Sequence, residues 1–251
     1  MSAEAVLQVR GLNKSFGALK VAQNIAFDLH AGARVGLIGP NGAGKTTLVN
    51  LLTGTIRPDA GTIALAGTRI EGLKPETRVH RGLVRTHQIN KLLLENTVIQ
   101  NVAVAVAERE RVAWRMLRYG PQWRRCMDEA AHYLAETGLS DTAGRLVSEL
   151  PYGRQRLLEI AIALALKPRV LLLDEPGAGV PSAETHIIHD ALERLPAQIA
   201  ILIIEHDMDL VFRFAAEIIV LVQGAVLRRD VPAAIAADAE VRAVYLGRSV
   251  A

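Results

Sequence analysis

Residues 34–50 read RVGLIGPNGAGKTTLVN, an apolar run that passes through a glycine-rich turn into a helix-like stretch. Gly39, Gly44, Lys45 and Thr46 match the pattern G-x-x-x-x-G-K-[ST]. The glycines allow successive backbone N–H groups to surround phosphate oxygens, and the following helix directs the positive end of its dipole at them. The predicted nucleotide-binding loop consists of Gly39, Pro40, Asn41, Gly42, Ala43, Gly44, Lys45, Thr46 and Thr47.

The acidic motif VLLLDEP occupies residues 170–176. Apolar residues followed by Asp174 and Glu175 are typical of a buried strand that delivers carboxylates at its carboxyl end, where open α/β sheets bind ligands. Downstream of a phosphate loop, the motif predicts that Asp174 holds Mg²⁺ through water and that Glu175 accepts a proton from an attacking water. Lys45 would supply a charge to the β- and γ-phosphates, and Thr46 a hydroxyl ligand to Mg²⁺.

Strand-like and helix-like segments alternate over much of the chain, which predicts a mainly parallel sheet. The expected strands are residues 6–10, 25–30, 34–38, 62–66, 83–86, 170–173 and 199–204, with a hairpin formed by 218–222 and 225–228. The expected helices are residues 47–53, 152–166, 182–195 and 207–214. A helical block over 97–165, broken at Gly120-Pro121, interrupts the alternation and predicts an inserted subdomain.

The composition of the 251 residues excludes several classes of protein. With 50% hydrophobic and 22% charged residues, the chain is not a disordered or acidic solvating protein. No apolar run approaches the roughly 20 residues that span a bilayer. The net charge of +3 is too small to predict a nucleic-acid binder, and a lone cysteine, Cys126, excludes an internal disulfide framework.

The chain resembles the ATP-binding-cassette (ABC) ATPases over nearly its whole length. Residues 85–88 (RTHQ) are similar to the Q-loop, with Gln88 as its glutamine and His87 where phenylalanine is usual. His206 matches the switch histidine, Phe16 the aromatic residue that stacks on adenine, and residues 177–181 the D-loop. The signature motif falls on Leu150, Pro151, Tyr152, Gly153, Arg154 and Gln155.

The resemblance implies an α/β fold: a P-loop NTPase (RecA-like) core with an N-terminal antiparallel β region and an inserted α-helical subdomain. We expect one ABC ATPase domain over 1–251, with the nucleotide-binding core at 1–88 and 166–251 and the helical subdomain, carrying the signature, at 89–165. The implied cofactors are ATP and Mg²⁺. The implied site residues are Glu175 as general base, Gln88 as contact to the attacking water, His206 as contact to the γ-phosphate, and Thr46, Gln88 and Asp174 as metal-binding residues.

In this family two subunits sandwich two ATP molecules, and each signature motif and D-loop acts on the partner's ATP. Here the residues that act on the chain's own ATP are intact, whereas Pro151 replaces a serine, Arg154 a glutamine and Pro181 an Asp or Asn. Pro151 suits a helix start but removes a hydroxyl and an N–H group, and we expect the charge of Arg154 to compensate in part. The second ATPase subunit is therefore predicted to be a different chain, with unequal ATP sites.

Three features are similar to the branch that imports branched-chain amino acids: Tyr152, the helical insertion near residues 104–126, and the tail VRAVYLG at 241–247. The resemblance implies a peripheral ATPase at the cytoplasmic face of the cell membrane, powering integral membrane permease subunits that a solute-binding protein supplies, with no nucleic acid. The alternatives are an ABC ATPase for another solute (urea, amides or lipid) and a weakly hydrolysing ATP-dependent clamp in an asymmetric heterodimer. A nucleic-acid-directed cassette is disfavoured because the sequence has neither tandem cassettes nor a long coiled coil.

Overall fold

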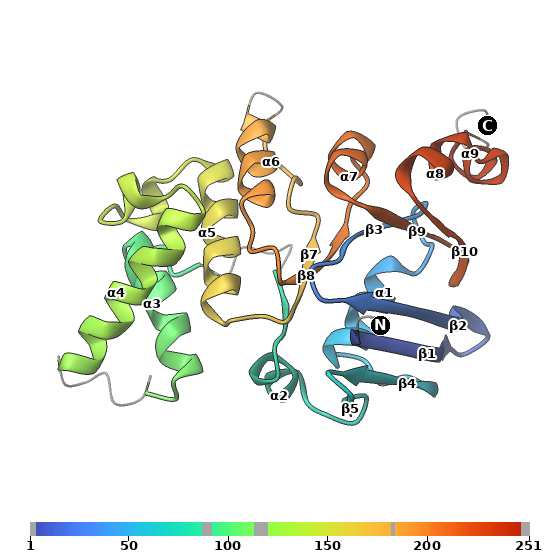
Figure 1. The fold of residues 1–251 in the computed structure, drawn as a ribbon, viewed down its shortest axis with the longest axis horizontal. Coiled ribbons are helices and arrows are strands. Elements are labelled where there is room, and N and C mark those ends of the chain that lie inside the picture. The colour runs from blue at the N-terminus through green and yellow to red at the C-terminus, as the bar shows by residue number, and fades with distance from the viewer. Residues whose placement is uncertain (1–3, 87–91, 113–119, 182–183, 247–251) are drawn as a thin grey trace. The chain divides into compact units, whose positions relative to one another are not determined.

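The computed structural model describes residues 4–86, 92–112, 120–181 and 184–246 (Figure 1). The chain forms two compact units. Unit 1 comprises Met1–Val84, Arg169–Glu175 and Ala197–Ala251, and unit 2 comprises Arg85–Pro168 and Pro176–Pro196. Residues 176–196 thus group with the helical insertion, whereas the sequence analysis assigned them to the nucleotide-binding core. The division of the chain into a nucleotide-binding core and a helical subdomain at residues 88 and 166 stays a prediction.

Unit 1 contains two sheets. The first has the strand order β2-β1-β4-β5 and is antiparallel. The second has the order β10-β9-β3-β8-β7-β6, and its pairs β9–β3, β3–β8 and β8–β7 are parallel. The strands are β1 (Ala5–Phe16), β2 (Leu19–His30), β3 (Arg34–Ile38), β4 (Ala60–Leu65), β5 (Thr68–Arg69), β6 (Leu83–Arg85), β7 (Val170–Asp174), β8 (Ala200–Ile204), β9 (Glu217–Val222) and β10 (Ala225–Asp230). The predicted α/β fold with an N-terminal antiparallel region is confirmed.

The helices of unit 1 are α1 (Lys45–Thr53), α2 (Pro75–His80), α7 (Met208–Phe214), α8 (Pro232–Ala237) and α9 (Ala239–Leu246). The predicted helices at 47–53 and 207–214 and the predicted hairpin at Gln223-Gly224 are confirmed, and both hairpin residues have positive φ, as this tight turn requires. Short helices such as α2 and α8 were not predicted because six residues are too few to display a helical period.

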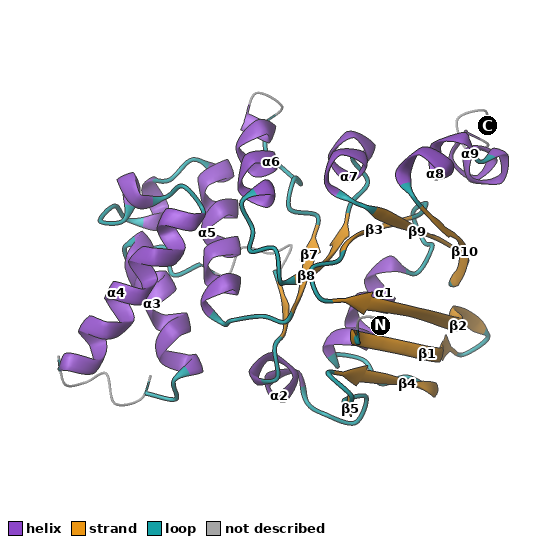
Figure 2. Cartoon of the chain, in the orientation of Figure 1, coloured by secondary structure: helices purple, strands orange, loops and turns teal. Residues whose placement is uncertain are grey.

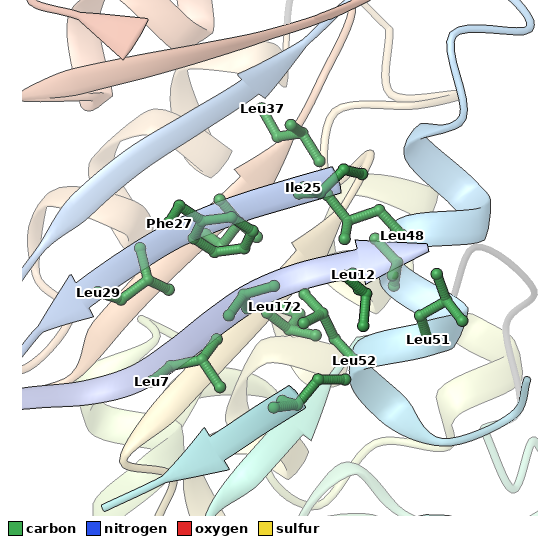
Figure 3. Close-up of a cluster of buried hydrophobic side chains, with 14 of the residues drawn as sticks. Leu7, Leu12, Ile25, Phe27, Leu29, Leu37, Leu48, Leu51, Leu52 and Leu172 are labelled. Carbon is green, nitrogen blue, oxygen red and sulfur yellow. The ribbon is translucent and has the colours of Figure 1, made fainter. Parts of the chain in front are cut away.

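One face of the parallel sheet packs against the antiparallel sheet and α1 (Figure 3). Leu37 and Leu172 of the parallel sheet, Ile25 and Phe27 of β2, and Leu48 of α1 belong to one buried cluster. Ile38, the next residue after Leu37, points to the other face, where α7, α8 and α9 contribute buried side chains. Because β3 and α1 are both buried in this way, the loop between them is fixed at both ends.

Unit 2 consists of helices and their connections (Figure 2). They are α3 (Val98–Arg109), α4 (Pro121–Glu136), the 3-10 turns η2 (Ser140–Thr142) and η3 (Val147–Glu149), α5 (Tyr152–Ala165) and α6 (Thr185–Glu193). Helix α3 begins with a capping box between Thr97 and Gln100, and α4 begins at Pro121, where the sequence predicted the break. Among the helices in the described ranges, none is long and apolar enough to cross a bilayer.

Candidate functional site

The glycine-rich loop of residues 39–44 connects β3 to α1 in unit 1. Gly44 has φ of +101°, and a Cβ there would lie 2.5 Å from the carbonyl oxygen of Val21, so only glycine fits this position. Gly224, in the turn between β9 and β10, donates its N–H group to the carbonyl of Ala43 at 2.8 Å. The loop is therefore packed against β2 and hydrogen-bonded to the turn between β9 and β10, so distant parts of unit 1 help to fix its shape.

Lys45 turns back over this loop from the first position of α1. Its Nζ donates to the carbonyl of Gly39 at 2.5 Å and to that of Pro40 at 3.2 Å. Burial lowers the pKa of Lys45, and nearby Glu175 partly offsets that effect. The first N–H groups of a helix have no partners within it, and they carry the positive end of the helix dipole. The loop thus combines a lysine, backbone donors and a helix dipole, which suit a phosphate group.

Two carboxylates stand at the carboxyl end of β7. Asp174 is buried and lies in register with Ile204 of the neighbouring strand β8. Glu175 follows with φ of +49°, which is uncommon for a residue with a side chain, and its N–H group donates to the carbonyl of Ile204 at 2.8 Å. The Glu175 side chain is 29% exposed.

His206 lies at the corresponding end of β8. Its Nδ1 is 3.8 Å from Oε1 of Glu175, and its side chain is 67% exposed. The parallel register of β3, β8 and β7 brings the phosphate loop, His206 and the two acidic residues to one edge of the sheet (Figure 1). The structure therefore brings together, within unit 1, residues that the sequence placed far apart.

Oxygen ligands for a divalent cation are present at this edge. The exposed Thr46 and the buried Asp174 offer a hydroxyl and a carboxylate, the hard donors that Mg²⁺ prefers, although two protein ligands are too few to hold the ion without phosphates and water. Within the described ranges, no group of three or more His, Cys, Asp or Glu residues is placed to hold a metal. The residues fit a cation that arrives with a nucleotide, and Gln88 lies outside the described residues.

Phe16 lies at the end of β1 and is 51% exposed. Its ring is accessible rather than part of the core, and Nζ of Lys14 lies 5.5 Å from the ring centroid. An exposed aromatic ring of this kind is available to stack on a planar ligand.

The segment 150–155 lies in unit 2, at the start of α5. Pro151 occupies the N-cap with φ of −54° and ψ of 151°, so the helix begins normally at Tyr152. Arg154 does not present a free charge: its Nη1 lies 2.8 Å from both carboxylate oxygens of Asp141. The expected compensation for Pro151 by Arg154 is therefore weakened, because this guanidinium is already paired.

The family profile described as ABC transporter matches residues 22–178, which contain both the glycine-rich loop and the acidic motif. The chain belongs to the ABC transporter family. It is 38% identical over 251 residues to the high-affinity branched-chain amino acid transport ATP-binding protein BraF of Pseudomonas aeruginosa, covering 97% of this chain and 98% of that protein. It is 39% identical to the corresponding protein LivG of Escherichia coli (strain K12), covering 98% and 99%.

The fold agrees with solved ATP-binding cassettes. The ADP conformation of MJ1267, an ATP-binding cassette of an ABC transporter, superposes with a TM-score of 0.85 at 28% identity, covering 98% of this chain and 100% of that chain. That solved cassette is in an ADP conformation, and the glycine-rich loop of this chain lies within the region that the family profile matches.

Several polar residues of this ABC transporter chain escaped the sequence analysis. The guanidinium of Arg156 donates to the hydroxyl of Tyr152 at 2.6 Å and to the carboxylate of Glu159 at 2.8 Å. In unit 1, the tail helix α9 brings the hydroxyl of Tyr245 to the backbone N–H of Gly39; burial raises the pKa of Tyr245 to about 12, and the Gly39 N–H group opposes that rise. Tyr245 lies in the tail motif at 241–247, but the sequence did not indicate its contact with Gly39, because the two residues are far apart in the chain. The contacts of Arg156 depend on which side chains share one face of α5.

Proposed function

We propose that this chain is the ATP-hydrolysing subunit of an importer for branched-chain amino acids. The observation that carries the proposal is the shared sheet edge of unit 1, where Lys45, Glu175 and His206 lie together. A phosphate cradle, a carboxylate and an imidazole are the groups that attack of water on a γ-phosphate requires. The substrate class comes from the names of the BraF and LivG proteins, which this chain matches over nearly its whole length.

In this proposal the predicted site residues have the following roles. Residues 39–47 bind the phosphates, with Lys45 at the β- and γ-phosphates, and Phe16 stacks on adenine. Glu175 takes the proton of the attacking water, His206 contacts the γ-phosphate, and Gln88 contacts that water. Thr46, Gln88 and Asp174 would hold Mg²⁺ directly or through water, and the ion would supply neutralisation of phosphate charge.

The partners proposed for the chain are a second ATPase subunit, integral membrane permease subunits and, indirectly, a solute-binding protein. Residues 150–155 would face the ATP of the second subunit, which we expect to be a different chain because Pro151 and Pro181 depart from the usual residues. Residues 89–165 would act as the helical subdomain, and the complex would sit at the cytoplasmic face of the cell membrane.

The test is co-purification of the tagged chain from membranes, followed by uptake into proteoliposomes. We expect a permease and a second ATPase to accompany the chain, and ATP to drive leucine uptake when the solute-binding protein is added. Lys45→Ala should abolish uptake without preventing assembly, because it removes the phosphate-binding cation. Uptake of a different solute would overturn the substrate class, and recovery without a permease would overturn the transport role.

A weakly hydrolysing clamp is a second candidate, favoured by the altered signature. Pro151 offers neither a hydroxyl nor an N–H group, and Arg154 is engaged by Asp141. The two candidates differ in turnover by the purified complex. Several ATP molecules hydrolysed per second would support the importer, whereas tight ATP binding with turnover slower than one per minute would support the clamp.

A further inference from the structure

Glu205 is a buried acid that immediately follows β8. It is only 2% exposed, and it stands beside His206 in the sequence. A carboxylate in this position costs free energy unless hydrogen bonds and nearby charges compensate it. The groups that contact the Glu205 carboxylate therefore indicate its role.

The Glu205 carboxylate holds the turn between β8 and α7. Its Oε2 accepts from the backbone N–H of His206 at 3.1 Å and from that of Asp207 at 3.4 Å. Asp207 in turn caps α7, where its Oδ1 accepts from the N–H of Asp209 at 3.0 Å. Two carboxylates in succession thus fix the path of the chain through His206.

The imidazole of His206 lies between two carboxylates. Its Nδ1 is 3.8 Å from Oε2 of Glu205 and 3.8 Å from Oε1 of Glu175. The Glu205 side chain is buried, whereas the Glu175 side chain is partly exposed. Both acids thus lie near the same ring nitrogen, Nδ1, and the contacts of one ring nitrogen influence the tautomer and the role of the other one, Nε2.

We propose that Glu205 is a positioning residue for His206: its buried carboxylate anchors the backbone of His206 and keeps the Nδ1 edge of the ring beside Glu175, so that Nε2 faces the nucleotide. The proposal rests on the proposed ATPase function. In this proposal Glu205 acts through His206 and not directly on ATP or water. An acid that only stabilised the turn would affect the chain equally whether or not the imidazole is present.

A double-mutant cycle separates these two roles. Glu205→Leu removes both the acceptor and the charge, and Glu205→Gln keeps an acceptor of the same size without the charge. We expect kcat for ATP to fall at least 10-fold in Glu205→Leu and 3- to 10-fold in Glu205→Gln, with the Kd for ATP changed less than 2-fold. On a His206→Ala background, either substitution should lower the residual kcat less than 1.5-fold. Glu240→Gln, on an exposed part of α9, is the matched control and should match the parent chain.

A second readout needs no nucleotide. The imidazole ¹⁵N resonances of His206, assigned by their loss in His206→Ala, should move in Glu205→Gln and stay unchanged in Glu240→Gln. Equal losses of kcat on both backgrounds, unchanged kcat in Glu205→Gln, or unmoved His206 resonances would each overturn the proposal. If Glu205→Leu does not fold, Glu205→Gln decides the question alone. Failure of the ATPase function would be recognised separately, because the parent chain would then show no turnover while the resonance test still applied.

Discussion

Glu175 and His206 follow different strands, yet Oε1 of Glu175 lies 3.8 Å from Nδ1 of His206. Strands β7 and β8 are parallel neighbours, so the residues at their carboxyl ends meet. Glu175 has a positive φ, which is uncommon for a residue with a side chain. This pair is the chemical centre of the proposed ATPase site.

Glu175→Gln should retain ATP binding and lose turnover. Glutamine has nearly the same shape but cannot take a proton from water, so kcat should fall about 10²–10⁴-fold. The Kd for ATP, measured by fluorescence of a labelled nucleotide, should stay within about 3-fold of the parent value. Glu76→Gln, on the exposed side of α2, is the control. Normal turnover in Glu175→Gln would show that Glu175 is not the base.

Pro151→Ser should raise the ATPase rate of the chain when it is assayed without a second ATPase subunit. Serine accepts the φ and ψ of the N-cap and restores both a hydroxyl and an N–H group at the start of α5. We expect turnover to rise several-fold, measured as phosphate release. Pro232→Ser at the start of α8 should leave the rate unchanged. High activity in the parent chain that Pro151→Ser does not alter would refute the idea of unequal sites.

Arg78 caps the carboxyl end of α1, the helix that follows the phosphate loop. Its buried guanidinium donates to the carbonyls of Leu51 at 2.8 Å, Leu52 at 2.6 Å and Glu71 at 2.9 Å. Arg78→Met would leave these buried acceptors unpaired, at a cost of about 1–3 kcal/mol each, so unfolding should become easier by at least about 3 kcal/mol.

Urea denaturation measures this change. Arg81→Met, three residues further on and exposed, is the matched control and should shift the free energy of unfolding by less than about 0.5 kcal/mol. A similar loss in both variants would mean that the Arg78 hydrogen bonds do not stabilise the end of α1.

Glu129 should make the stability of unit 2 depend on pH in the acid range. The hydrogen bond from Arg109, with help from Lys167, lowers the pKa of Glu129 to about 2. Because the folded pKa lies below the unfolded value, the stabilisation is complete above about pH 5 and is lost as the pH falls toward 2.

Glu129→Gln should therefore lower the free energy of unfolding at pH 7 and have little effect near pH 2, as measured by urea denaturation at each pH. Glu108→Gln, on an exposed part of α3, should change stability little at pH 7. An equal effect of Glu129→Gln at both pH values would show that its charge does not stabilise unit 2.

The phosphate loop and the acidic motif were predicted with their flanking elements because both are local patterns. Strands at 34–38 and 170–173 and the helix after the loop appear as β3, β7 and α1. The strand predicted at 6–10 is longer, reaching Phe16, because β1 and β2 pair along a ribbon with register shifts that interrupt the alternation of apolar residues. Helix α6 is shorter than predicted, Thr185–Glu193 instead of residues 182–195, and residues 182 and 183 lie outside the described ranges.

The sequence by itself determined the class of site, because glycine spacing, a lysine and a strand ending in two acids are sufficient to specify a phosphate loop and its carboxylates. Only the tertiary structure decided how the remaining charged side chains are used: Glu205 is buried beside His206, Arg78 caps α1 from a separate helix, and Arg154 is paired with Asp141. A local motif depends on residues that are neighbours in the chain. The partner of a charged side chain depends on which distant segments the sheet and the helices bring to it.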